Sequence, residues 1–139
     1  MPTQKPDSTK NSSKKKMVII IIAVLVGLLH LVTGPQYAGP FPVFVNSYLI
    51  DILLPFALYM LLTLFGTTLF ADWAVKAILV FSLGLIVELS QYVDAPLLGS
   101  VFDPWDIFMY ALGVGLAVFC DLHLFPHQFS FWQPEEKAP

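Results

Sequence analysis

Apolar residues gather into four long runs that are separated by short polar or proline-rich segments. The runs cover residues 17–33, 47–65, 73–92 and 105–125. Each run approaches the length that a helix needs to cross the hydrocarbon core of a bilayer, roughly 20 residues. The pattern predicts an all-α polytopic membrane protein, with a four-helix transmembrane bundle over residues 17–125 and the lipid bilayer as its first partner.

Composition agrees with a membrane domain. Of the 139 residues, 57% are apolar and 12% are charged, and the mean hydropathy is +0.74. A soluble chain of this composition would have too little polar surface. The net charge is -3 and the longest basic run is Lys14 to Lys16. Nucleic-acid binding depends mainly on neutralising phosphates, so we exclude a nucleic-acid partner.

The two ends of the chain set the expected topology. Residues 1–16, rich in Lys, Ser and Thr, predict a flexible tail, and residues 126–139 are expected to form a C-terminal tail. Lys14 to Lys16 directly precede the first run, which favours a cytoplasmic N-terminus by the positive-inside rule. An even number of spans returns the C-terminus to the cytoplasm. No signal-peptide cleavage site follows the first run, so we interpret it as an uncleaved anchor.

Four acidic residues lie within or at the edge of these runs: Asp51, Glu88, Asp103 and Asp106. In the expected topology all four face outwards. Ionisable residues inside a membrane are costly and often mark a functional site. We therefore interpret the four acids as a candidate site.

Helical spacing extends this site, because residues three or four apart share one face of a helix. On the fourth run the acids continue into Tyr110 and then into Gly113 and Ala117, two small residues that allow close helix packing in lipid. On the third run Glu88 shares a face with Gln91. The candidate ligand-binding residues are Asp51, Glu88, Gln91, Asp103, Asp106 and Tyr110.

Simple helix capping is the alternative for part of this pattern. Asp103 followed by Pro104 can begin a helix without any further role, and Asp72 before Trp73 has the same form. Glu88 caps nothing, because it lies one turn inside its run. Asp121 is interpreted as the solvated end of the fourth span.

The acids have few possible basic partners. The chain contains no arginine, and its predicted outer loops contain no lysine. Lys76 lies at the other end of the third run, about 18 Å of helix rise from Glu88. The acids must therefore be hydrated, share protons, or hold a cation that comes from outside. Oxygen ligands alone favour Mg²⁺ or Ca²⁺, with Glu88, Asp103 and Asp106 as the candidate metal ligands.

The order of these residues resembles a known family. Glu88-Leu-Ser-Gln91 ends one span, Asp103-x-x-Asp106 opens the next, and Tyr110 and Gly113 follow. Together they are similar to the VanZ-like family of small bacterial membrane proteins, over roughly the C-terminal half of the chain. The resemblance implies a multi-pass protein of the bacterial cytoplasmic membrane with a cell-envelope role. It also implies a lipid-linked or cell-wall ligand, but no particular reaction.

Two positions depart from the family pattern. The family usually has an arginine shortly before the Asp pair, where this chain has Gly99 and Ser100, and an asparagine where this chain has Tyr110. An ion-paired or anion-binding site is therefore not carried over from the resemblance.

Several functions fit this sequence. The leading one is a VanZ-like protein whose outward-facing carboxylate pocket binds a cation or an amine-bearing or polyol envelope ligand. The second is a structural protein or subunit, in a homo-oligomer or with a membrane partner, whose polar layer only fixes helix packing. The third is a metal-assisted hydrolase or transferase on a lipid-linked substrate, with Glu88 and Asp103 or Asp106 as the acid and base. A small ion-coupled transporter would need to oligomerise.

Overall fold

The computed structural model describes residues 8–33, 36–93 and 102–133, and this part of the chain is helical. Its long helices are α1 (Ser8–Val32), α2 (Leu49–Leu62), α3 (Trp73–Tyr92) and α4 (Pro104–Phe119). A π-helical turn, η1 (Phe44–Tyr48), leads into α2, and a second, η3 (Cys120–Leu124), extends α4 into the short helix α5 (Phe125–Gln128). Two 3-10 turns complete the fold, η2 (Thr68–Ala71) and η4 (Ser130–Trp132).

Four helical stretches among the described residues are long and apolar enough to cross a membrane. They are Thr9–Val32, Phe44–Leu62, Trp73–Tyr92 and Pro104–Gln128. This confirms the predicted all-α membrane protein with four spans. The third span has the bounds expected from the sequence, and the other three differ from expectation mainly at their ends.

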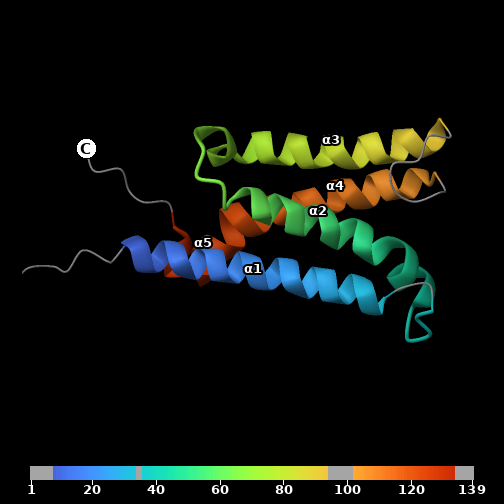
Figure 1. The fold of residues 1–139 in the computed structure, drawn as a ribbon, viewed down its shortest axis with the longest axis horizontal. Coiled ribbons are helices and arrows are strands. Elements are labelled where there is room, and N and C mark those ends of the chain that lie inside the picture. The colour runs from blue at the N-terminus through green and yellow to red at the C-terminus, as the bar shows by residue number, and fades with distance from the viewer. Residues whose placement is uncertain (1–7, 34–35, 94–101, 134–139) are drawn as a thin grey trace, which may run out of the picture.

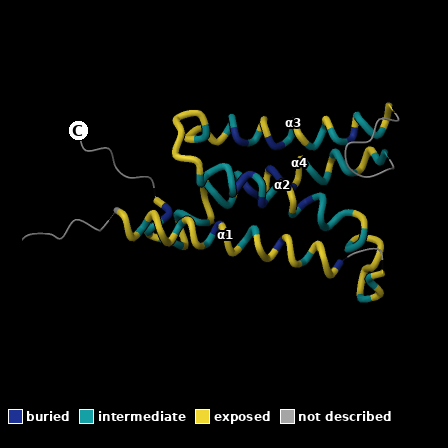
Figure 2. Tube along the Cα trace, in the orientation of Figure 1, coloured by how far each residue is buried: buried dark blue, intermediate teal, exposed yellow. Residues whose placement is uncertain are grey.

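Helix α2 is the centre of the bundle. It packs against α1 on one side and against α4 and α3 on the other (Figure 1). The remaining close contact is between α3 and α4. Helix α1 is exposed along much of its length (Figure 2), with large apolar side chains such as Leu25, Leu28 and Leu31 on its surface. Such a surface suits contact with lipid rather than water.

A glycine allows α4 to pack closely on α2. A Cβ atom at Gly113 would collide with the backbone carbonyl oxygen of Ile52 and would lie 2.8 Å from Cγ of Pro55. Gly113 and Ala117 are both buried, so the small residues of α4 face the bundle as predicted. Close backbone approach of this kind is how small residues stabilise helix pairs in lipid.

Both predicted tails are partly folded. Helix α1 begins at Ser8, so residues 8–16 are helical, and lysine is a good helix former. After the fourth span, η4 packs against α1, and Trp132 is buried with only 3% of its surface exposed. The described part of the expected C-terminal tail therefore contacts the bundle through Trp132. Residues 1–7 and 134–139 lie outside the described residues.

The two ends of the bundle differ in their charged residues. One end holds the start of α1, the start of α3 and the region after α4 (Figure 1). The lysines of the described chain are all near this end, at positions 10, 14, 15, 16 and 76. The opposite end holds the start of α2, the end of α3 and the start of α4, and there the candidate acids lie.

Candidate functional site

Glu88 is at the centre of the acidic end. It lies near the end of α3, and only 1% of its surface is exposed. Its carboxylate Oε1 accepts a hydrogen bond from the Tyr110 hydroxyl at 3.3 Å, and Oε2 accepts one from the backbone N–H of Asp103 at 3.4 Å. Both donors belong to the start of the fourth span, so Glu88 joins α3 to α4.

A glycine on α3 makes room for Tyr110. Gly84 is one helical turn before Glu88, and a Cβ atom there would lie 2.8 Å from Cδ2 of the Tyr110 ring. The ring therefore crosses α3 at Gly84, which aligns its hydroxyl with Glu88. A larger residue at position 84 would force the ring away.

Asp103 has two roles in the structure. Its Oδ1 accepts a hydrogen bond from the backbone N–H of Trp105 at 3.0 Å, so it caps α4 as its position before Pro104 predicts. Its Oδ2 accepts a hydrogen bond of 3.5 Å from the Tyr48 hydroxyl. Tyr48, in η1, was not among the predicted site residues. A tyrosine at the start of an apolar run is common at membrane interfaces, and its position alone does not point to an acid on another span.

Asp51 and Asp106 complete the group. The two carboxyl groups interact with each other and with Glu88, and Asp51 also interacts with Tyr110. Both aspartates are half-buried. The structure thus brings together all four predicted acids and Tyr110, from α2, α3 and α4. We call Asp51, Glu88, Asp103, Asp106 and Tyr110 the carboxylate layer.

Gln91 lies beside this layer. It is one turn after Glu88 on the same face of α3, and it is half-buried. The family departure at Gly99 and Ser100 lies outside the described residues, whereas the departure at Tyr110 lies within the carboxylate layer. The capping prediction for Asp72 is confirmed, because its Oδ1 accepts a hydrogen bond from the backbone N–H of Ala74 at 2.8 Å.

The described partners of the carboxylate layer are hydroxyl groups, a backbone amide and other acids. Within the described ranges, the one ion pair joins Lys76 to Asp121, at the other end of the bundle. No described set of three His, Cys, Asp or Glu side chains is arranged to hold a metal ion. The predicted Mg²⁺ or Ca²⁺ site at Glu88, Asp103 and Asp106 stays a prediction, which needs these acids to move closer together.

A second buried carboxylate lies at the lysine-rich end. The interpretation of Asp121 as a solvated residue is wrong, because its Oδ2 pairs with Nζ of Lys76 at 2.9 Å. The same oxygen accepts a hydrogen bond from the Tyr59 hydroxyl at 3.0 Å, and Oδ1 accepts one from Nε1 of Trp132 at 3.0 Å. Nζ of Lys76 also lies 4.5 Å from the centre of the Tyr59 ring, a cation-π contact. We call Tyr59, Lys76, Asp121 and Trp132 the lysine cluster.

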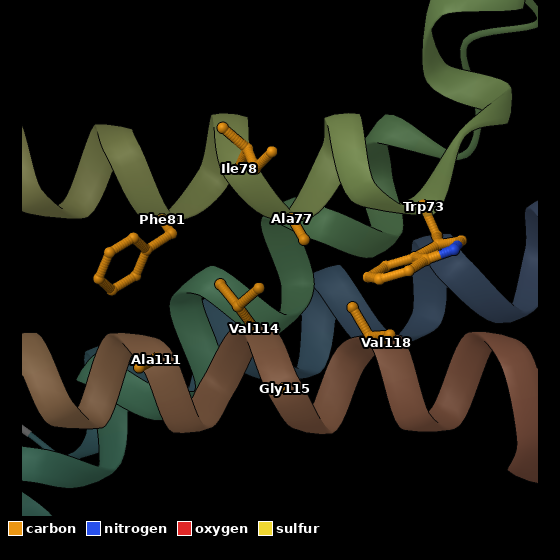
Figure 3. A pocket seen from close by; sticks show the side chains of 8 residues that line it. All are labelled: Trp73, Ala77, Ile78, Phe81, Ala111, Val114, Gly115 and Val118. Carbon is orange, nitrogen blue, oxygen red and sulfur yellow. The ribbon is translucent and has the colours of Figure 1, made fainter.

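A shallow groove of about 430 Å³ lies between α3 and α4 and is apolar. Trp73 and Phe81 lie toward its two ends, Ala111 lies across from Phe81, and Ala77, Val114 and Gly115 line the part between (Figure 3). The groove contains no member of the carboxylate layer. It therefore adds no polar chemistry to the candidate site.

The chain was compared with known proteins in three ways. It matches no protein-family model, no curated protein and no solved structure. The functional argument therefore rests on the residues and their arrangement.

Proposed function

We propose that this protein is a VanZ-like integral membrane protein whose carboxylate layer binds a cationic ligand at the outer face of the bacterial cytoplasmic membrane. The ligand is a divalent cation or an amine-bearing envelope compound. The observation that carries the proposal is the burial of the Glu88 carboxylate without a basic partner. Only 1% of the surface of Glu88 is exposed, and its described partners include no basic group. A buried carboxylate without a positive partner is costly unless it is protonated or a cation is bound.

The length of the hydrogen bonds supports this proposal. The two contacts to Glu88 and the contact from Tyr48 to Asp103 measure 3.3 to 3.5 Å. Hydrogen bonds to carboxylates are normally about 2.5 to 3.0 Å for hydroxyl donors. Carboxylates held this loosely can rearrange around a ligand. Contacts that tighten only in the complex are common in unliganded binding sites.

The outward orientation is part of the proposal and rests on charge distribution. The lysines near the spans are at the end of the bundle opposite the carboxylate layer. The positive-inside rule assigns that end to the cytoplasm, and with it the N-terminal and C-terminal tails. The carboxylate layer then faces the cell envelope, where a cell-wall precursor or its lipid-linked form is accessible. Glu88, Asp103 and Asp106, three of the residues that carry the resemblance, belong to this layer, which supports the family proposal.

A scaffold is the competing function, and a specific observation favours it. The bonds from Tyr110 and from the backbone of Asp103 to Glu88 join α3 to α4 without any ligand. Inter-helical hydrogen bonds of this type contribute about 0.6 kcal/mol each in membrane proteins. Under this alternative, Glu88 only fixes the position of α3 relative to α4.

Equilibrium dialysis of the purified protein in detergent separates the two functions. We expect saturable binding of Ca²⁺, Mg²⁺ or the diamine cadaverine by the wild type, and its loss in Glu88→Gln. Asp72→Asn is the matched control. Asp72 is an exposed acid that caps α3, and an asparagine at this position can form the same cap. This control should bind like the wild type. Wild-type protein that binds none of the three probes, or Glu88→Gln that binds as well as the wild type, would leave the scaffold function.

A further inference from the structure

A cleft of about 740 Å³ opens at the lysine-rich end of the bundle. Its wall combines the start of α1, the turn after α2, the start of α3 and the C-terminal turns. The charged residues that line it are Lys15, Lys76 and Asp121. It lies at the opposite end of the bundle from the carboxylate layer and shares no residue with it.

Two of these charges already compensate each other. Asp121 receives three donors, from Lys76, Tyr59 and Trp132, at 2.9 to 3.0 Å. Its two oxygens are therefore occupied within the lysine cluster. The cleft has one more lysine than it has acids, so its lining carries a net positive charge.

Lys15 is the source of this excess charge. It is half-buried, and its Nζ lies 4.6 Å from the centre of the Trp132 ring. In the described chain it has no ion pair, because the described ion pair joins Lys76 to Asp121. The Trp132 ring holds the ammonium group at the cleft by a cation-π contact. Asp121 attracts this ammonium group but forms no described ion pair with it, so Lys15 can donate to a phosphate oxygen.

The rest of the lining fits an amphiphilic ligand. Hydroxyl groups from Ser12, Thr67 and Ser130 provide further hydrogen-bond partners, and Phe70 and Phe131 provide apolar surface. The cleft lies at the end of the bundle where α1 and α3 begin and α2 ends, and a bilayer's headgroups would meet the bundle at such an end. Exposed Lys14 and Lys16 flank Lys15 in the sequence, and basic residues next to a span attract anionic lipids.

We infer that this cleft binds the phosphate of an anionic phospholipid headgroup, with Lys15 as the main contact. The headgroup phosphate accepts hydrogen bonds from the Lys15 ammonium group and from the cleft hydroxyls. The glycerol part and the beginning of the acyl chains lie against the phenylalanines. This site is independent of the carboxylate layer and of the proposed cation ligand.

Native mass spectrometry of the full chain in detergent can test the site, with phosphatidylglycerol and phosphatidylcholine added separately. We expect phosphatidylglycerol to bind more tightly. Lys15→Gln should weaken its binding roughly fivefold or more, the effect of one lysine near an anionic lipid surface. Lys16→Gln is the matched control, because Lys16 is exposed and does not line the cleft. Equal weakening by both variants, or equal binding of the two lipids, would overturn the proposal.

A second pair of variants leaves Lys15 in place, so the test does not depend on how Lys15→Gln folds. Ser12→Glu adds a negative charge to the cleft wall and should weaken phosphatidylglycerol binding. Ser13→Glu adds the same charge to an exposed neighbour outside the lining and should not. The same loss in both would contradict a cleft site. Inorganic phosphate is tested in the same way. If it binds as tightly as phosphatidylglycerol and its binding depends on Lys15, free phosphate replaces the lipid as the assigned ligand.

Discussion

Asp121 and Glu88 are both buried carboxylates in membrane-spanning helices, at opposite ends of one bundle. Asp121 has a lysine at 2.9 Å and two further donors at 3.0 Å. Glu88 has two neutral donors at 3.3 and 3.4 Å. The first carboxylate is neutralised by the chain itself, with short bonds that leave no oxygen free. The second has longer bonds and no described basic partner, so a cation bound from outside would compensate its charge.

Under our proposal, this difference separates a charge that only stabilises the fold from one that binds a ligand. A buried ion pair that is fully hydrogen-bonded fixes the position of the helices and offers nothing to a ligand. A cluster of acids with loose contacts stores unfavourable interactions that a bound cation would relieve. The two ends should therefore respond in opposite ways to removal of a charge.

The largest expected effect is at the lysine cluster. Lys76→Met removes the cation from Asp121 and leaves a carboxylate buried, which should cost about 3 to 5 kcal/mol of unfolding free energy. The double variant Lys76→Met with Asp121→Asn should recover much of this loss, because no unpaired charge remains. Thermal and denaturant unfolding in detergent measures both.

Glu88→Gln is the matched change at the carboxylate layer. It also removes a buried charge, but it should leave stability unchanged or raise it, because no buried partner loses its counter-charge. A large loss in Glu88→Gln together with a small loss in Lys76→Met would reverse the comparison between the two ends.

Helix packing below the carboxylate layer gives the next effect. Gly113→Leu places a side chain against the Ile52 carbonyl and the Pro55 ring, and should cost about 1 to 3 kcal/mol through overpacking. Gly115→Leu is the control, since a Cβ atom there has no neighbour within 4 Å. Equal melting temperatures for the two variants would show that α4 does not pack on α2 through Gly113.

The smallest expected effect separates the two roles of Asp103. Asp103→Ala should lower stability by about 1 kcal/mol through the lost cap, whereas Asp103→Asn keeps a cap and should be close to neutral. If Asp103 also contributes charge to a bound cation, Asp103→Asn should weaken cation binding while the melting temperature stays the same. Cation affinity that is unchanged in Asp103→Asn would restrict Asp103 to capping.

The fold was largely predictable from the sequence, because lipid imposes a length and polarity on each span that can be read directly. Trp73 to Tyr92 forms a helix with the expected bounds, and the cap at Asp103 follows from its local sequence. The convergence of the acids was predictable for a similar reason: helical spacing and alternating direction place them at one depth.

The lysine cluster was not predictable in the same way. Lys76 and Asp121 are separated by 45 residues, and no local pattern relates them. Trp132 lies in residues 126–139, which were expected to form a tail. Its indole N–H nevertheless donates a hydrogen bond to Asp121. Only the return of η4 to the bundle creates this contact. Tyr48 was missed because its hydrogen bond to Asp103 joins residues 55 positions apart, and no local pattern relates them.

The central claim, that the carboxylate layer takes a cation from outside whereas the lysine cluster does not, is tested most directly by unfolding in the presence of cation. We would measure the melting temperatures of wild type, Glu88→Gln and Asp121→Asn in detergent, first with chelator and then with increasing Ca²⁺, Mg²⁺ or cadaverine. We expect a saturable rise in melting temperature for wild type and for Asp121→Asn, the latter from a lower starting value, and no rise for Glu88→Gln. Two results would contradict this proposal. One is a rise that persists in Glu88→Gln and disappears in Asp121→Asn, and the other is no rise in the wild type with Ca²⁺, Mg²⁺ or cadaverine.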